Sequence, residues 1–145
     1  MTFPAVRDET SAPYFDALRE GRLILRSCTR CRHIGRPDTL SCSSCHSDEL
    51  TWVGSTGDGV VVSAVVDHAS VPEPTVLALV ELREGPWIAS RILDVATASD
   101  VPVCAPVRLR ITEFADGEAI PTFILASDHR CDGAPDPRVI TRRLD

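Results

Sequence analysis

The chain has 145 residues, an apolar content of 43%, and a formal net charge of −6 without a single lysine. This composition is globular, and its acidic balance disfavours binding to phosphate backbones, which depends on clustered Lys and Arg. No apolar run approaches the roughly 18–20 residues of a membrane span, and the N-terminus lacks the basic start and apolar stretch of a secretory signal. We therefore expect a cytoplasmic protein without a membrane partner.

Residues 1–22 are predicted to form an N-terminal segment that contains one short helix. The hydroxyl of Ser11 is expected to cap this helix, Pro13 suits its first turn, and Gly21 ends it. Phe15 and Leu18 are three residues apart and would share one face of the helix.

Two Cys-x-x-Cys pairs, Cys28 with Cys31 and Cys42 with Cys45, lie within eighteen residues. Each pair can aim two thiolates at one point, and two pairs separated by ten residues can complete a tetrahedral shell that suits Zn²⁺. Four thiolates close this shell and leave no position for a catalytic water. We therefore predict a rubredoxin-like zinc ribbon over residues 23–53, in which these cysteines hold a structural Zn²⁺.

Other interpretations of the cysteine pairs fit less well. A thioredoxin-like redox pair would need a surrounding βαβ pattern, which neither pair has. A rubredoxin-type iron site favours apolar shielding, whereas arginines and serines flank these cysteines. His33 and His46 lie close to the second cysteine of each pair and could each replace a thiolate, although four suitably spaced thiolates are already present.

From residue 54 onward, short β-branched runs alternate with turns that contain Pro and Gly. Five strands are predicted, over Val60–Val66, Val76–Leu82, Trp87–Leu93, Val107–Phe114 and Thr122–Leu125. Five strands after a Gly-rich entry favour a small OB-fold barrel over a sandwich, which would need about seven. We expect a mainly β protein with an OB-fold domain over residues 54–130.

The final segment, residues 131–145, contains two prolines and three arginines. We expect it to be a C-terminal arm that is free or docks onto another molecule. A second group of arginines surrounds the cysteine pairs and could meet an anionic ligand or an acidic partner surface, or could be solvated. This group consists of Arg22, Arg26, Arg30, Arg32 and Arg36.

Several motifs occur in a recognisable order. They are Pro13-Tyr14-Phe15, Glu20-Gly21-Arg22-Leu23, the two cysteine pairs, Trp52, Gly57-x-Gly59-x-Val61 and Ala78-Leu79-Val80-Glu81-Leu82. Over about residues 13–126 this order resembles the DUF35 family of zinc-ribbon/OB-fold accessory proteins. The resemblance implies a non-catalytic subunit that binds a thiolase-superfamily enzyme acting on acyl-CoA, such as a thiolase, an acyltransferase or a retro-aldolase of steroid side-chain degradation.

The chain departs from the family pattern at several loop positions. The usual glycine after the first cysteine pair is Arg32, an aromatic-Pro-Pro-Arg stretch is replaced by residues 34–37, and serines replace the prolines around Cys42. The family's Gly-x-Pro-Val element is represented by residues 104–107, so Cys104 is expected to be a turn residue with a small buried thiol. All four ribbon cysteines remain, and the resemblance carries the metal role to them.

Candidates for catalysis by the chain itself are weak. His68 follows Asp67, and a histidine and a cysteine are close together within residues 128–131, but neither pair has the setting of an activated nucleophile. Gly57-x-Gly59 lacks the third glycine of a dinucleotide-binding loop and is predicted to be a tight turn. We therefore predict no catalytic residue in this chain.

The resemblance implies the small subunit of an α2β2 heterotetramer with a thiolase-like partner, which meets acyl-CoA through the complex, for example in lipid or steroid metabolism. No nucleic-acid partner is expected. The alternative function is single-strand nucleic-acid binding by the OB-fold, which needs a basic groove with exposed aromatic rings. The barrel region offers Trp87, Phe114 and Phe123, interleaved with acidic residues.

Overall fold

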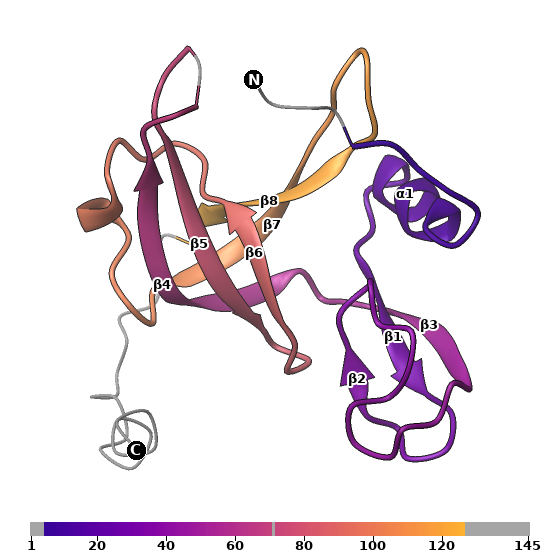
Figure 1. Ribbon diagram of the computed structural model, residues 1–145. Helices are drawn as coiled ribbons and strands as arrows, with labels where there is room; N and C mark the ends of the chain where they lie inside the picture. Colours follow the sequence, from indigo (N-terminus) through magenta and orange to yellow (C-terminus); the bar gives the residue numbers. More distant parts are fainter. Residues whose placement is uncertain (1–4, 71, 127–145) are drawn as a thin grey trace.

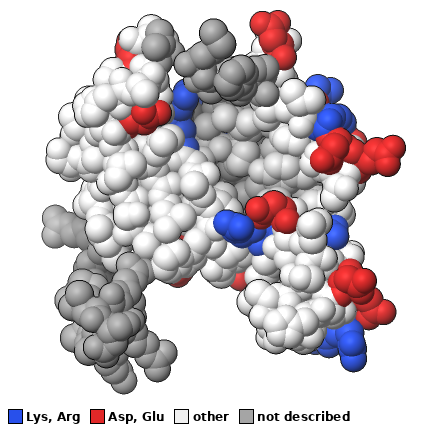
Figure 2. All heavy atoms as spheres, in the orientation of Figure 1, with Lys and Arg blue, Asp and Glu red and all other residues white. Residues whose placement is uncertain are grey.

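The computed structural model describes residues 5–70 and 72–126 (Figure 1). Helix α1 (Ala12–Arg19) and a small sheet of β1 (Ile24–Cys28), β2 (Ile34–Gly35) and β3 (Leu50–Gly54) lie on one side of the molecule. On the other side is a five-stranded sheet of β4 (Asp58–Asp67), β5 (Thr75–Leu82), β6 (Trp87–Arg91), β7 (Pro106–Thr112) and β8 (Ile120–Leu125), with a 3-10 turn, η1 (Ala98–Asp100), before β7. The surface is hollowed between the two sides (Figure 2).

The mainly β prediction is confirmed, and the five predicted barrel strands differ from the observed ones by at most two residues at either end. Strand β2 and the turn η1 were not predicted. None of the helices in the described ranges has the length and apolar character that a bilayer span requires. The predicted C-terminal arm, residues 131–145, lies outside the described residues.

Helix α1 forms where it is predicted, but the predicted cap is wrong. The Ser11 hydroxyl makes no capping bond to the helix. It accepts a hydrogen bond from the Asp8 N–H at 2.9 Å, and Asp8 Oδ1 accepts from the Ser11 N–H at 2.7 Å. These bonds form a turn that leads into the helix. At its other end Gly21 has a φ of +82°, a conformation that favours glycine, and the helix stops as predicted.

The five-stranded sheet has the order β6-β5-β4-β7-β8, with all neighbours antiparallel. A register shift between Val61 and Ser63 in the long strand β4 increases the local twist and helps the sheet to curl. The ends of the sheet meet where Ile92 bridges Phe123 and the Leu93 N–H donates to the Phe123 carbonyl at 2.8 Å. The result is the curled half-barrel of an OB-fold.

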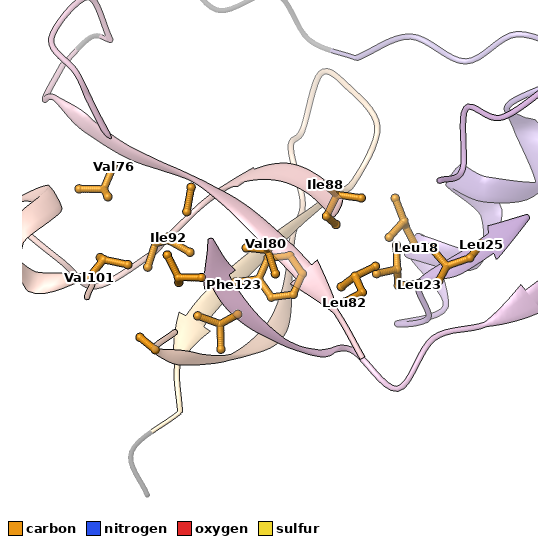
Figure 3. Packing of buried hydrophobic residues seen from close by; sticks show 14 of the residues in the cluster. Leu18, Leu23, Leu25, Val76, Val80, Leu82, Ile88, Ile92, Val101 and Phe123 are labelled. Atoms are coloured by element: carbon orange, nitrogen blue, oxygen red, sulfur yellow. The ribbon is translucent and has the colours of Figure 1, made fainter. Parts of the chain in front are cut away.

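One apolar core continues through both sides of the molecule (Figure 3). Alternate residues of β5 point inward, so Val80 packs beside Phe123 in the barrel, while Leu82 and Ile88 carry the core toward the helix. The core ends there in Leu18, Leu23 and Leu25. The helix and the ribbon therefore share buried apolar surface with the barrel.

Ion pairs also join the N-terminal segment to the barrel. Glu118 precedes β8 and is only 8% exposed. It accepts two hydrogen bonds from Arg7, at 2.7 and 2.9 Å, and lies 3.2 Å from Arg19 of α1. The bond from Arg7 is the main reason why the pKa of Glu118 is lowered, although burial opposes it.

Candidate metal centre

The ribbon brings the four predicted thiols together. Their Sγ atoms all lie within 4.8 Å of one another; Cys28 Sγ is 3.6 Å from Cys45 Sγ, and Cys31 Sγ is 3.4 Å from Cys42 Sγ. A tetrahedral shell with Zn–S bonds of about 2.3 Å has S–S edges of about 3.8 Å. The observed spacing is close to these edges, so the four cysteines are positioned to bind a zinc ion.

The two cysteine pairs share one backbone conformation. The N–H of the first cysteine donates to the carbonyl five residues later, and its own carbonyl accepts from the N–H four residues later. These distances are 2.9 and 2.8 Å at Cys28, and 2.7 and 2.9 Å at Cys42. The residue after each pair, Arg32 or His46, has a left-handed conformation with φ of 65° or 63°. Each pair is thus a closed turn that holds two thiols on one side.

The backbone of these turns favours the thiolate form. The N–H of Cys31 is the main reason why the pKa of Cys28 falls to about 6, and the N–H of Cys45 likewise lowers the pKa of Cys42. At Cys45 the Ser47 N–H also favours the thiolate, but burial and the neighbouring thiols outweigh it and raise the pKa to about 11. Zinc coordination by Cys45 would displace the proton of that thiol.

Neither histidine of the ribbon belongs to the thiol cluster. The group of side chains that could hold a metal contains the four cysteines and not His33 or His46. His33 Nε2 instead lies 3.1 Å from Ser43 Oγ at the exposed surface. The other ring nitrogen makes no hydrogen bond to a described residue, so this pair lacks the third group that orients a catalytic base.

Asp67 and His68, which were considered for catalysis, lie where β4 ends in a turn. His68 is exposed in the turn after β4. The Asp67 carboxylate accepts from Ser70 Oγ and from the Ala69 N–H, both at 2.9 Å, and the bond from Ser70 is the main reason that its pKa is lowered. Asp67 therefore stabilises the turn. The candidate pair within residues 128–131 lies outside the described residues.

Gly57 and Cys104 were both predicted to lie in turns of the backbone. The predicted tight turn is present at Gly57, where a Cβ atom would lie 2.9 Å from Leu109 Cβ at the entry to the barrel. Cys104 has the predicted place in a turn, with a φ of 66°. Its expected burial is wrong, because it is half-buried.

The sequence did not indicate the cleft between the ribbon and the barrel. This cleft has a volume of about 490 Å³ and includes the rings of Tyr14, Phe15 and Trp52. The guanidinium of Arg26 lies 4.4 Å from the centroid of the Trp52 ring. Arg26 belongs to the arginine group noted around the cysteines. Its place in a cleft could not be predicted, because the cleft is formed by elements that are far apart in the sequence.

Comparison with known proteins agrees with the two-part architecture. The family profile of the ChsH2 rubredoxin-like zinc ribbon domain matches residues 15–51, and that of the ChsH2 C-terminal OB-fold domain matches residues 52–112. A protein from Thermomonospora curvata named "Probable enoyl-CoA hydratase alpha subunit" is 29% identical over 124 residues. The match covers 83% of this chain, which spans only 38% of the length of that relative.

Two solved structures have the same fold. The structure named "Ltp2-ChsH2(DUF35) aldolase" contains a chain that is 29% identical, with a TM-score of 0.73 over 86% of this chain and all of that chain. A DUF35 protein of unknown function from Sulfolobus solfataricus is 17% identical, with a TM-score of 0.59 over 81% of this chain and 86% of its own. The second likeness concerns the fold alone. Because the profiles cover the ribbon and most of the barrel and the fold agrees, this chain belongs to the ChsH2 (DUF35) family of zinc-ribbon/OB-fold proteins.

Proposed function

We propose that this chain is a non-catalytic accessory subunit of a thiolase-superfamily enzyme that acts on acyl-CoA thioesters. The observation that carries the proposal is the match to the ChsH2(DUF35) chain, which is aligned over its whole length and is named together with Ltp2 as an aldolase. In this proposal the partner supplies the catalytic residues, as a thiolase, acyltransferase or aldolase. One copy on each half of a two-fold symmetric partner would give an α2β2 assembly.

The zinc site has a structural role in this proposal. Cys28, Cys31, Cys42 and Cys45 would hold Zn²⁺ within the ribbon of residues 23–53, beside an OB-fold domain of residues 54–130. A shell of four thiolates has no open position for substrate, so the metal would stabilise the ribbon rather than take part in the reaction. A rigid ribbon can then present its loops to a partner in one conformation.

An apolar outer face on the barrel supports a protein partner. Val65 of β4 and Leu77 of β5 are a directly opposed cross-strand pair and are 60% and 37% exposed. Leu79 and Ala89 extend the same face onto β6. Most of the surface over this sheet is uncharged in Figure 2. Exposed apolar side chains that gather on one face of a folded protein are typical of interaction sites.

The alternative of nucleic-acid binding has little support in the described residues. Phe123 has no exposed surface and belongs to the core, so it cannot stack on a base. The indole N–H of Trp87 donates to Glu81, which places a carboxylate beside that ring. The net charge of −6 also disfavours single-strand binding, which depends on a basic groove.

The proposal is tested with a candidate thiolase-like subunit from the same organism. Co-purification, sedimentation of the mixture, and turnover of acyl-CoA by the partner with and without this chain are the measurements. We expect a complex, higher turnover with the chain, and no turnover or enoyl-CoA hydration by the chain alone. No complex at micromolar concentration together with unchanged turnover would refute the proposal.

Two matched variants test the outer face. Val65→Asp places a charge on that face and should weaken the complex about tenfold or more, because a buried charge without a partner is costly. Val6→Asp alters an exposed valine in the N-terminal segment and should leave the affinity unchanged. Equal affinities of both variants would remove the outer face from the interface without refuting the partnership.

A further inference from the structure

The cleft between the ribbon and the barrel has the features of a small-molecule site. Helix α1 contributes Tyr14 and Phe15, whose rings meet edge to face with centroids 5.2 Å apart, and the ribbon contributes Trp52 and Leu40. Ile88 of β6 also lines the cleft. Pockets of about 300–1,000 Å³ with mainly apolar walls and a few polar groups are typical ligand sites. The volume of about 490 Å³ falls within this range.

The polar group that distinguishes this cleft is Arg26. Its side chain is half-buried and lies over the Trp52 ring, yet none of the ion pairs among the described residues involves it. A cation–π contact leaves the positive charge uncompensated, and partial burial increases its preference for an anion. Arg26 can therefore pair with a negatively charged ligand.

The other charged groups of the cleft have partners within their own loops. Arg36 forms an ion pair with Asp38 at 3.2 Å. The Asp8 carboxylate accepts hydrogen bonds from the N–H and hydroxyl of Ser11. Asp38 also lies close enough to contribute to the pKa of Tyr14, which burial raises to about 12, so the phenol stays neutral. Arg26 is therefore the cation among the described cleft residues that has no ion pair.

We propose that this cleft binds a small organic acid, whose apolar body packs against the aromatic walls and whose carboxylate pairs with Arg26. The aromatic rings accept a flat or an aliphatic body, and the guanidinium selects for the negative charge. All parts of the cleft belong to this chain, so the inference does not rest on the proposed partnership. It assigns to the accessory chain a ligand site of its own.

Calorimetric titration of the full zinc-loaded chain tests the proposal with two matched pairs of probes. Octanoate and 1-octanol share an aliphatic body, and 1-naphthaleneacetate and its neutral amide share a ring system. At least one acid should bind about tenfold or more tightly than its neutral counterpart, as expected for a charge-assisted hydrogen bond in a partly buried site. In a Trp87→Phe variant, Trp52 is the single tryptophan and its fluorescence should change on binding.

Variants separate the role of Arg26 from general charge effects. Arg26→Gln should remove the preference for the acid but leave the neutral probes unaffected, whereas Arg83→Gln, outside the cleft, should change neither. Leu40→Asp adds a negative charge at a site that is 73% exposed and should weaken acid binding without harming the fold, while Val65→Asp is its control on the outer face. Equal binding of acid and neutral probes, an unchanged Arg26→Gln variant, or no binding at millimolar concentration would overturn the proposal.

Discussion

Arg32 and His46 occupy equivalent left-handed positions, one after each cysteine pair. Left-handed backbone costs a residue with a Cβ atom roughly 1–2 kcal/mol. Arg32 and Cys104 both stand where the DUF35 pattern has glycine, and both have a positive φ. Arg32 and Cys104 therefore occupy a conformation that favours glycine, which the glycine of the family pattern would suit.

Replacing Arg32 with glycine should stabilise the ribbon. The gain of roughly 1–2 kcal/mol from relieved backbone strain is partly offset by the roughly 0.5–1 kcal/mol that glycine loses in conformational entropy on folding. We expect a net stabilisation of about 0.5–1 kcal/mol, measured by denaturant unfolding with zinc present. Arg30→Gly is the control, because Arg30 lacks a positive φ and should gain nothing. A destabilised Arg32→Gly variant would show that the arginine side chain matters more than the strain.

Loss of one thiol should unfold the ribbon. Structural zinc contributes about 10–16 kcal/mol of apparent binding free energy that is coupled to folding in small modules. We expect Cys28→Ser or Cys42→Ser to lose zinc, measured by elemental analysis, and to lose the near-ultraviolet circular dichroism of Trp52. Cys104 lies away from the thiol cluster, so Cys104→Ser should retain both the bound zinc and the circular dichroism of Trp52. A ribbon that remains folded with less than one equivalent of metal would contradict a structural role for zinc.

The strands of the barrel could be predicted because each carries a β-branched or alternating run between turns. β5 shows this most clearly, since every second residue along its whole length is buried. β2 has only two residues and exists because it pairs with β1, so no local pattern predicts it. The predicted helix cap at Ser11 was wrong for a similar reason. The hydrogen bonds between Ser11 and Asp8 compete with capping, and they depend on the path of the preceding chain.

Gly59 marks a close approach between β4 and β5 and should not tolerate a side chain. A Cβ atom there would lie 2.7 Å from the Glu81 carbonyl oxygen and 2.8 Å from Val80 Cγ1, and the paired ladder holds that carbonyl in place. We expect Gly59→Ala to reduce the free energy of unfolding by about 1–3 kcal/mol, as in other overpacked sites. Gly54→Ala, with no atom within 4 Å, should stay within about 0.5 kcal/mol of the wild type. Similar thermal shifts in the two variants would rule out the close contact as the cause.

At the scale of the whole molecule, contacts between distant residues join the parts. Glu84 of the β5–β6 turn accepts a hydrogen bond from Ser55 Oγ at 2.9 Å and one from the Thr56 N–H at 2.6 Å, which fixes the connection between ribbon and barrel. Burial opposes the charge of Glu84, but these bonds outweigh it and lower its pKa. The sequence predicted the two parts and not this junction, because nothing in a local pattern indicates which carboxylate meets which loop.

The ion pairs of Glu118 should make the attachment of the N-terminal segment sensitive to acid. The pKa of Glu118 is lowered from 4.5 in the folded state, chiefly by Arg7, so its stabilising effect is complete above about pH 4.5. That effect is lost as the pH falls below 4.5 through the folded-state pKa.

Glu118→Gln retains the shape of the side chain but loses the charge, so it should be less stable at neutral pH and show a shallower loss of stability in acid. Glu20→Gln, in an exposed pair with Arg22, should follow the wild type, because surface pairs contribute little. Thermal unfolding of the three proteins between neutral pH and the acid range is the measurement; parallel profiles for wild type and Glu118→Gln would mean that the buried carboxylate does not control this attachment.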